Sequence, residues 1–209
     1  LVKKDKGIDV EFDENMADPK VYKLWQEGQT CGIFQFESQG MTNFMKELKP
    51  DCLEDLIAGV SLYRPGPMDQ IPRYIRGKQN PGHNEYTHPS LEPILNVTYG
   101  CMVYQEQVMQ IVRDLAGYSL GRADLVRRAM GKKKLDVMAK EREVFINGQV
   151  DENGKVEVPG CVRNGIDAES ANKIFDEMAE FAKYAFNKSH AACYAVVAYR
   201  TAYLKAYYP

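Results

Sequence analysis

The stretch QEQVMQIVRDLAGYSLGRADLVRRAMGKKKLDVMAKEREVFING, residues 105–148, decides the fold. The spacing of its apolar residues predicts three successive helices, over residues 105–118, 122–131 and 135–148. Outside this stretch, further helices are expected over residues 18–28, 41–50, 52–63, 167–186 and 189–207. The helix over 18–28 is expected to begin with Asp18 as its N-cap and Pro19 at its first position, and to end at Gly28.

Strand signals are few by comparison. The segments GIFQFE (32–37) and CMVY (101–104) are short candidate strands. The segment QVDENGKVEVPG (149–160) places Asn153-Gly154 between alternating valines, which predicts a β-hairpin. SLEPILN (90–96) is a short helix at most, and the polar residues 77–89 predict an exposed loop. The expected fold is therefore mainly α, with a small hairpin and few short strands.

Composition narrows the kinds of protein that this chain can be. Its 209 residues suit one domain, or one large domain with a small lobe. A formal net charge of −2 argues against a generally basic coat for nucleic acid, so an electrostatic role must be local. No apolar run approaches the roughly 20 residues of a membrane span, so no membrane partner is expected. The five widely spaced cysteines form no CxxC, which indicates reduced thiols in a cytoplasmic protein and argues against zinc.

The segment LVRRAMGKKK (125–134) holds five positive charges in this nearly neutral chain. Arg127 and Arg128 are adjacent on the predicted helix, about 100° apart, so they can grip one polyanion from two sides. Gly131 is expected to end the helix, with Lys132 and Lys134 beyond it. A solvated helix end that matches the helix dipole is the alternative reading. Guanidinium forks, however, suit phosphate oxygens.

A second polar cluster, in YAFNKSHAACYA (184–195), consists of Asn187, Lys188, Ser189 and His190 between apolar helical stretches. Asn or Ser can cap the following helix, whose free N–H groups then form an anion site beside Lys188. The alternative is a simple turn between helices. In SLYRPGP, the rigid Pro-Gly-Pro turn presents Arg64 at a defined place, or Arg64 is an ordinary surface residue beside a helix-breaking turn.

Other chemistry is weakly signalled. The acidic segment IDVEFDEN (8–15) can in principle bind Mg²⁺, although acidic loops before a helix are commoner. Tyr104, Gln105 and Glu106 are interpreted as an aromatic anchor and a helix start. The sequence has no acid–base pair, no Walker loop and no GxGxxG, so phosphate binding would rest on Arg, Lys and helix ends.

Five motifs in this order, GIFQFESQGM, LYRPGP, TYGCMVYQEQVMQI, LVRRAMGKKK and FNKSHAACYA, closely resemble the alpha subunit of bacterial DNA polymerase III, the C-family replicative polymerase. The resemblance covers essentially residues 1–209 and implies most of a mainly helical fingers domain. The chain begins Leu-Val-Lys-Lys and ends in KAYYP, and we expect it to be a piece of a longer protein. Residues 149–160 look like a surface hairpin insertion relative to the family.

The resemblance implies roles for the basic residues. Arg127 and Arg128 would face the triphosphate of the incoming dNTP, with positive potential added by Lys132 and Lys134. Nucleotide-binding roles are likewise implied for Arg64, Asn187, Lys188, Ser189 and His190. The aspartates that hold catalytic Mg²⁺ in the family's palm lie upstream of Leu1, so this chain is expected to contain no catalytic or metal-binding residue and to be inactive alone.

Implied partners are the dNTP, template-primer DNA, the rest of the polymerase subunit and other replisome subunits such as the sliding clamp. Two other classes of function compete with this DNA-directed DNA polymerase reading. One is a non-catalytic helical module that binds nucleic acid through a basic face. The other is a helical scaffold whose charges are merely solvated. A preference for dNTP would favour the first reading, and a steep salt dependence with DNA alone would favour the second.

Overall fold

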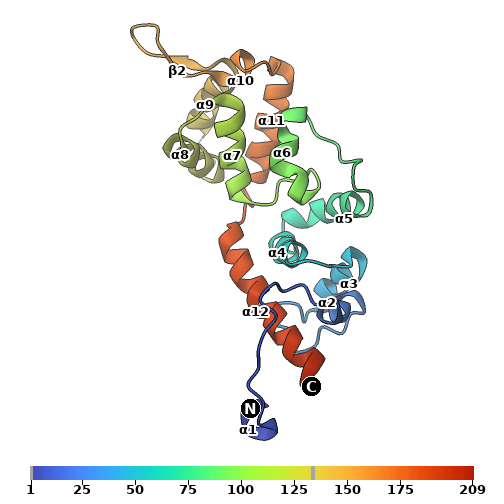
Figure 1. Cartoon of the computed structure of the whole chain (residues 1–209). Coiled ribbons are helices and arrows are strands. Elements are labelled where there is room, and N and C mark those ends of the chain that lie inside the picture. The colour runs from blue at the N-terminus through green and yellow to red at the C-terminus, as the bar shows by residue number, and fades with distance from the viewer. Residues whose placement is uncertain (1, 133–134) are drawn as a thin grey trace. The chain divides into compact units, whose positions relative to one another are not determined.

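The computed structural model describes residues 2–132 and 135–209, and the chain divides into two compact units. The terminal unit contains the chain up to Arg64 together with the residues from Lys188 onward, and the central unit contains Pro65–Asn187. The described residues form twelve α-helices and one two-stranded antiparallel sheet, so the mainly α prediction is confirmed (Figure 1). Among these residues, no helix combines the length and apolarity that a membrane crossing requires.

The terminal unit is built around two helices that pack against each other, α4 (Leu53–Leu62) and α12 (Lys188–Tyr207). Small residues recur along α12 every three or four positions and are fully buried, at Ala191, Ala195, Ala198 and Ala202. Their size lets the backbone of α12 approach its neighbours closely. The unit also contains α1 (Val2–Lys6), α2 (Pro19–Gln26) and α3 (Gln39–Leu48).

Local capping explains where these helices begin. Asp18 accepts a hydrogen bond from the Lys20 amide and Pro19 opens α2, as the sequence predicts. The acidic segment before α2 has a structural role here. Asp13 accepts hydrogen bonds from the Asn15 and Ala17 amides, which closes a turn.

The central unit contains the remaining helices. Its apolar core is lined by α7 (Gln105–Ala116), α8 (Leu120–Gly131), α9 (Leu135–Asn147) and α11 (Ala168–Phe181). On α7 the buried Val108, Ile111, Val112 and Leu115 follow the helical period. Around this core lie α5 (Ile71–Gln79), α6 (Glu92–Leu95) and α10 (Gly160–Arg163), with three short 3₁₀ helices, η1 (Pro67–Gln70), η2 (Pro89–Leu91) and η3 (Asn96–Thr98).

The predicted hairpin is present as β1 (Gln149–Val150) and β2 (Val156–Val158), which project beyond the helices of the central unit (Figure 1). Its turn is longer than the two-residue turn that Asn153-Gly154 suggests. Asp151 organises the turn, because its side chain accepts hydrogen bonds from the Asn153 and Lys155 amides. That the hairpin is an insertion relative to the family stays a prediction.

The two short candidate strands were wrong. Residues 32–37 form turns, with the Ile33 amide bonded to the Thr30 carbonyl, the Phe36 amide to the Ile33 carbonyl, and Gln35 at φ 69°. Ile33 and Phe36 are buried because of this turn spacing, not because of strand alternation. Residues 101–104 are buried but pair with no strand among the described residues. Tyr104 alone makes an isolated bridge, to Phe186.

Helix α5 was not predicted, and its last residues fall in the expected loop 77–89. The Pro-Gly-Pro turn that ends at Pro67 was interpreted as helix-breaking. In the fold, Pro67 and Pro72 each lie in the first turn of a helix, where the missing N–H costs nothing. The exposed loop therefore begins after Gln79.

Candidate functional site

Helix α8 gathers three charged side chains on one face. Ser119 caps the helix, and its buried face is formed by Ala123, Val126, Ala129 and Met130. Asp124, Arg127 and Arg128 lie at positions i, i+3 and i+4, so their side chains are neighbours on the helix surface. The core-facing residues thus fix the direction in which the arginine pair projects.

Asp124 binds both arginines. Arg127 Nη2 lies 2.7 Å from Asp124 Oδ1, and Arg128 Nη2 lies 2.7 Å from Asp124 Oδ2. Only 24% of the Arg127 side chain is exposed, against 62% of the Arg128 side chain. The Arg127 side chain is therefore mostly buried and restrained, whereas Arg128 presents most of its surface to solvent.

The ion pairs set the charge state of this face. The hydrogen bond from Arg127 lowers the pKa of the Asp124 carboxyl below its ordinary value, and the hydrogen bond from Arg128 acts in the same direction. Asp124 is therefore ionised at neutral pH and offsets one of the two arginine charges. A net positive charge of about one unit remains on the trio, because two guanidinium groups share one carboxylate.

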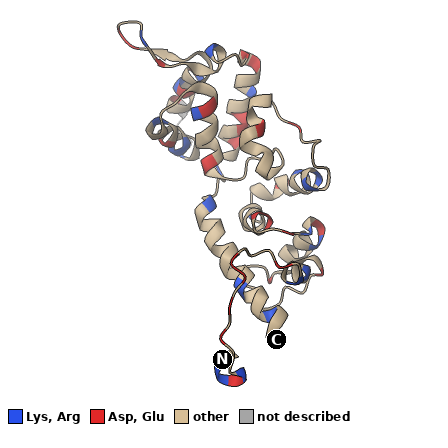
Figure 2. Cartoon of the chain, in the orientation of Figure 1, with Lys and Arg blue, Asp and Glu red and all other residues tan. Residues whose placement is uncertain are grey.

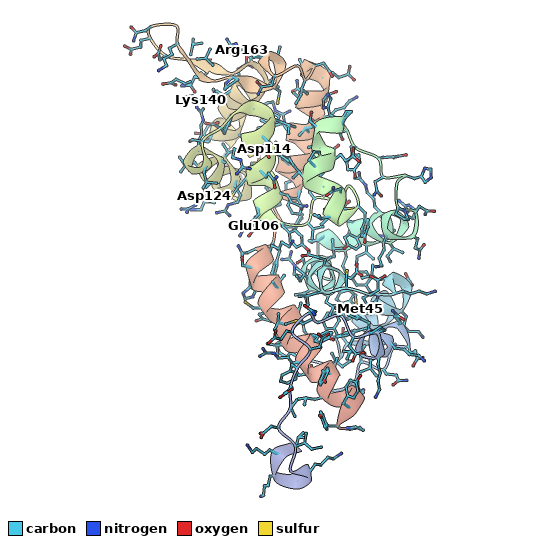
Figure 3. The ribbon with its side chains drawn as sticks, viewed as in Figure 1. Met45, Glu106, Asp114, Asp124, Lys140 and Arg163 are labelled. Carbon is cyan, nitrogen blue, oxygen red and sulfur yellow. The ribbon has the colours of Figure 1, made fainter. Side chains whose placement is uncertain are left out.

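The beginning of α7 joins this face. Arg127 Nη1 donates to Gln105 Oε1 at 2.8 Å, and the Gln105 amide donates to the Phe186 carbonyl at 2.9 Å. Asn187 Nδ2 in turn donates to Glu106 Oε1 at 2.7 Å. Figure 3 labels Asp124 on α8 and Glu106 at the first turn of α7. Hydrogen bonds thus connect three segments that are distant in sequence, around residues 105, 127 and 187.

A buried glutamine holds the first turn of α7 in place. Gln107 Oε1 accepts from the Val103 and Tyr104 amides, at 2.9 and 3.0 Å, and Gln107 Nε2 donates to Thr98 Oγ1 at 2.8 Å. Because these groups are buried, each bond satisfies a donor or acceptor that water cannot reach. Gln107 therefore positions the residues that meet Arg127 and Asn187.

Sequence reasoning selected some of these residues and missed others. Arg127, Arg128 and Asn187 lie in one hydrogen-bonded network of the central unit. Exposed Lys132 follows directly as the C-cap of α8, and Gly131 ends the helix as predicted. Lys134 lies outside the described residues. Asp124 was missed although its spacing to both arginines signals i,i+3 and i,i+4 pairs, and Gln105 and Glu106 were interpreted only as a helix start.

The other predicted residues lie in the terminal unit. Lys188 Nζ lies 3.0 Å from Glu54 Oε2, Ser189 is exposed in the first turn of α12, and the His190 ring lies 4.7 Å from the Tyr194 ring. Arg64 Nε donates to the Ser61 carbonyl at 2.9 Å, and burial lowers the pKa of its guanidinium. These four residues therefore belong to a different unit from Arg127, Arg128 and Asn187.

The one cluster of potential ligand atoms among the described residues is poorly suited to magnesium. Among the described residues, Asp51, Cys52 and Asp55 offer ligand atoms within 4.8 Å of one another. Asp55 Oδ2, however, accepts hydrogen bonds from the Asp51 amide and from Cys52 Sγ, so it closes the turn before α4. A thiol is also a poor Mg²⁺ ligand, since this ion prefers oxygen.

Comparison with known proteins identifies relatives of this chain. Residues 1–153 match the family model described as the bacterial DNA polymerase III alpha subunit finger domain. The matched range contains α8 with Asp124, Arg127 and Arg128, and the start of α7.

Individual relatives match almost all of the chain. It is 49% identical to the DNA polymerase III subunit alpha of Thermus aquaticus over 100% of its length, and 52% identical to that of Chlamydia trachomatis over 93%. It is 45% identical to the subunit of Aquifex aeolicus over 100% of its length. The chain spans only 17%, 15% and 17% of these three relatives.

Proposed function

Because this chain belongs to the family of bacterial DNA polymerase III alpha subunits, in which it corresponds to the finger domain, we propose that Arg127 and Arg128 bind the triphosphate of an incoming dNTP. The observation that carries this proposal is the shared carboxylate of Asp124. It holds Arg127 in a fixed direction and anchors one edge of the largely exposed Arg128.

The chemistry of nucleotidyl transfer supports this assignment. Phosphoryl transfer needs reactants in line and stabilisation of the charge that spreads over the phosphoryl oxygens, more than it needs covalent chemistry from the protein. A guanidinium already oriented by Asp124 and Gln105 offers its remaining N–H groups without reorganisation. Lys132 and Lys134 follow the pair in sequence and are proposed to add positive charge.

Other parts of the function are proposed from the family. The whole subunit acts as a DNA-directed DNA polymerase in the bacterial cytoplasm, on template-primer DNA and together with replisome partners such as the sliding clamp. Catalytic Mg²⁺ is held by residues outside this chain. Nucleotide contacts are also proposed for Asn187 in the central unit, and for Arg64, Lys188, Ser189 and His190 in the terminal unit, each to be tested by its own alanine variant.

Single-nucleotide incorporation by the subunit that contains this chain tests the arginine pair. Arg127→Ala or Arg128→Ala should lower kcat/KM for dNTP by about 1.5–3 kcal/mol, the value of a charge-assisted hydrogen bond. Arg→Lys should restore only part of the loss, because an ammonium cannot reproduce the fork. Arg113→Ala is the matched control, because Arg113 is an exposed arginine of α7 that also pairs with an aspartate.

Thermal unfolding of the same preparations separates binding from folding. The proposal expects the kinetic defect in both alanine variants, and at an unchanged Tm in Arg128→Ala, whose side chain is largely exposed. Unchanged nucleotide kinetics in both alanine variants would contradict it and would favour the solvated helix end. The 209-residue chain alone should show no template-dependent incorporation, because catalytic metal ligands are proposed to lie elsewhere.

A further inference from the structure

A pocket of about 390 Å³ opens on the central unit, away from α8 in sequence and sharing no residue with the candidate site. Its wall is formed by α5, the loop that follows α5, and the residue after η3. The lining carries three groups that bear or can accept positive charge and two side-chain amides, together with one aromatic ring: Arg73, Arg76, His83, Asn80, Asn84 and Tyr99. Figure 2 shows the basic positions of α5.

The arginines of this pocket differ from most others in the unit, although Arg163 likewise donates only to backbone carbonyls. Arg122, Arg127 and Arg142 each bind a carboxylate, at 2.5–3.2 Å. Arg73 and Arg76 are exposed and pair with no carboxylate within the described part of the chain. They are separated by three positions on α5, so both project from the same side of the helix. Their charges are therefore available to a ligand.

Packing gives the pocket a defined shape. Arg73 Nη2 donates to the Glu85 carbonyl at 3.0 Å, which orients the guanidinium without neutralising it. Asn80 Nδ2 donates to the Arg76 carbonyl at 3.0 Å. A Cβ on Gly77 would lie 2.4 Å from Tyr99 Cβ and 2.8 Å from Asn84 Oδ1, so only glycine lets α5 approach this wall so closely.

This set of groups selects the chemistry of the ligand. Guanidinium forks, amide N–H groups and an imidazole N–H are hydrogen-bond donors that match the oxygens of a phosphate. A competing explanation is that the basic residues only match the dipole of α5, which favours cations at its C-terminal end. That explanation would not require His83 and the two asparagines to line the same pocket as the arginines. The Glu85 side chain is the single carboxylate of this lining.

We propose that this pocket binds a backbone phosphate of a DNA strand, as a contact separate from the dNTP site on α8. A polymeric ligand is favoured because the relatives of this chain are DNA polymerase subunits, and because both arginines of the pocket are exposed to solvent. Arg76 is the decisive residue. Arg73 also borders a neighbouring cleft that carries Asp69, Glu177 and Glu180. Arg76 borders the proposed phosphate pocket but not that cleft.

Fluorescence anisotropy of the 209-residue chain with a labelled oligodeoxythymidine, measured over a range of salt concentrations, tests the proposal. Arg76→Ala should weaken binding about three- to tenfold at low salt and reduce the slope of log Kd against log salt by about 0.7, the value of one single-strand phosphate contact. Arg76→Lys should keep the slope but bind more weakly than the parent chain, because it retains the charge without the fork.

Lys140→Ala is the matched control. Lys140 is an exposed cation of the same unit, labelled on α9 in Figure 3, and its removal changes the net charge equally. Equal effects of Arg76→Ala and Lys140→Ala would overturn the proposal, as would no binding of the oligonucleotide. Calorimetry with inorganic phosphate tests whether the pocket binds free phosphate instead of a DNA strand. Arg76-dependent binding of free phosphate without binding of the oligonucleotide would also overturn the proposal. Because dNTP kinetics of the Arg127 variants do not involve Arg76, either proposal can fail alone.

Discussion

Arg127 donates two hydrogen bonds to the same oxygen of Asp124, from Nε at 3.1 Å and from Nη2 at 2.7 Å, across one turn of α8. The second Asp124 oxygen binds Arg128. One short acidic side chain therefore determines the orientation of both arginines, and Gln105 completes the restraint on Arg127 from α7. A preorganised pair of this kind requires little rearrangement when an anion binds.

The carboxylate of Asp124 should matter for nucleotide incorporation although it repels phosphate. We expect Asp124→Ala to lower kcat/KM for dNTP roughly fivefold, because Arg127 loses its restraint. Asp124→Asn should retain more activity, since the amide oxygen still accepts a hydrogen bond. Steady-state incorporation by the complete subunit measures both variants.

A second arginine–aspartate pair provides the control for this experiment. Arg113 Nε lies 2.7 Å from Asp114 Oδ1 on α7, and Figure 3 labels Asp114 as well as Asp124. Asp114→Asn should leave dNTP kinetics unchanged. A higher kcat/KM in Asp124→Ala would contradict the positioning role and would mean that Asp124 mainly competes with phosphate.

Removal of the Gln107 side chain should destabilise the central unit. Gln107→Ala leaves the buried amides of Val103 and Tyr104 without their acceptor, and each unsatisfied group costs about 1–3 kcal/mol. We expect a loss of about 2–4 kcal/mol in the free energy of unfolding, measured with urea. Gln110→Ala, on the same helix, should change it by less than about 0.5 kcal/mol. Equal effects would exclude the positioning role of Gln107.

How far the sequence predicts this structure depends on the range of the interactions. Helices α7, α8, α9, α11 and α12 follow from local apolar periodicity and capping, and the hairpin follows from Asn153-Gly154 between valines. Helix α5 was missed because its nine residues contain few apolar side chains and follow closely on the Pro-Gly-Pro turn. Residues 32–37 were misjudged because two aromatic residues in an apolar segment satisfy both strand and turn patterns.

The candidate site shows the same limit. The arginine pair on α8 is visible in the sequence, but the partners that orient it are not all local. Gln105 lies 22 residues from Arg127, and Asn187 lies 81 residues from Glu106. Nothing in a single sequence states that these side chains meet. Asp124 was the recoverable omission, since the i,i+3 and i,i+4 rule connects it to both arginines.

Thiol reactivity should divide the five cysteines into two classes. Cys31, Cys52 and Cys193 are exposed, whereas Cys101 and Cys161 are buried. Burial raises the pKa of Cys101 to about 11 and that of Cys161 to about 12, so both remain protonated thiols at pH 8. A disulfide reagent at pH 8 should modify three thiols rapidly in the folded chain and all five in denaturant. Rapid modification of five in the folded chain would show that the core of the central unit is open.

Two glycines at the hairpin allow backbone strain to be separated from steric crowding. Gly148 and Gly154 have similar positive φ angles, of 83° and 78°, where any other residue is strained. A Cβ on Gly148 would lie 2.3 Å from the Pro159 carbonyl oxygen and 2.4 Å from that of Val158, whereas a Cβ on Gly154 meets nothing within 4 Å. Gly154→Ala should therefore cost only the strain, about 1–2 kcal/mol.

Gly148→Ala should cost the same strain and, in addition, a displacement of the chain where α9 meets β2, about 1–3 kcal/mol more. Urea unfolding of the two variants measures the difference directly. Gln149, the next residue, accepts a hydrogen bond from Arg122 of α8 at 2.8 Å, so the displacement should also weaken the contact between the hairpin and α8. Hydrogen exchange should then be faster in α8 of Gly148→Ala but unchanged in Gly154→Ala. Equal destabilisation by both substitutions would show that the backbone at Gly148 relaxes without moving β2.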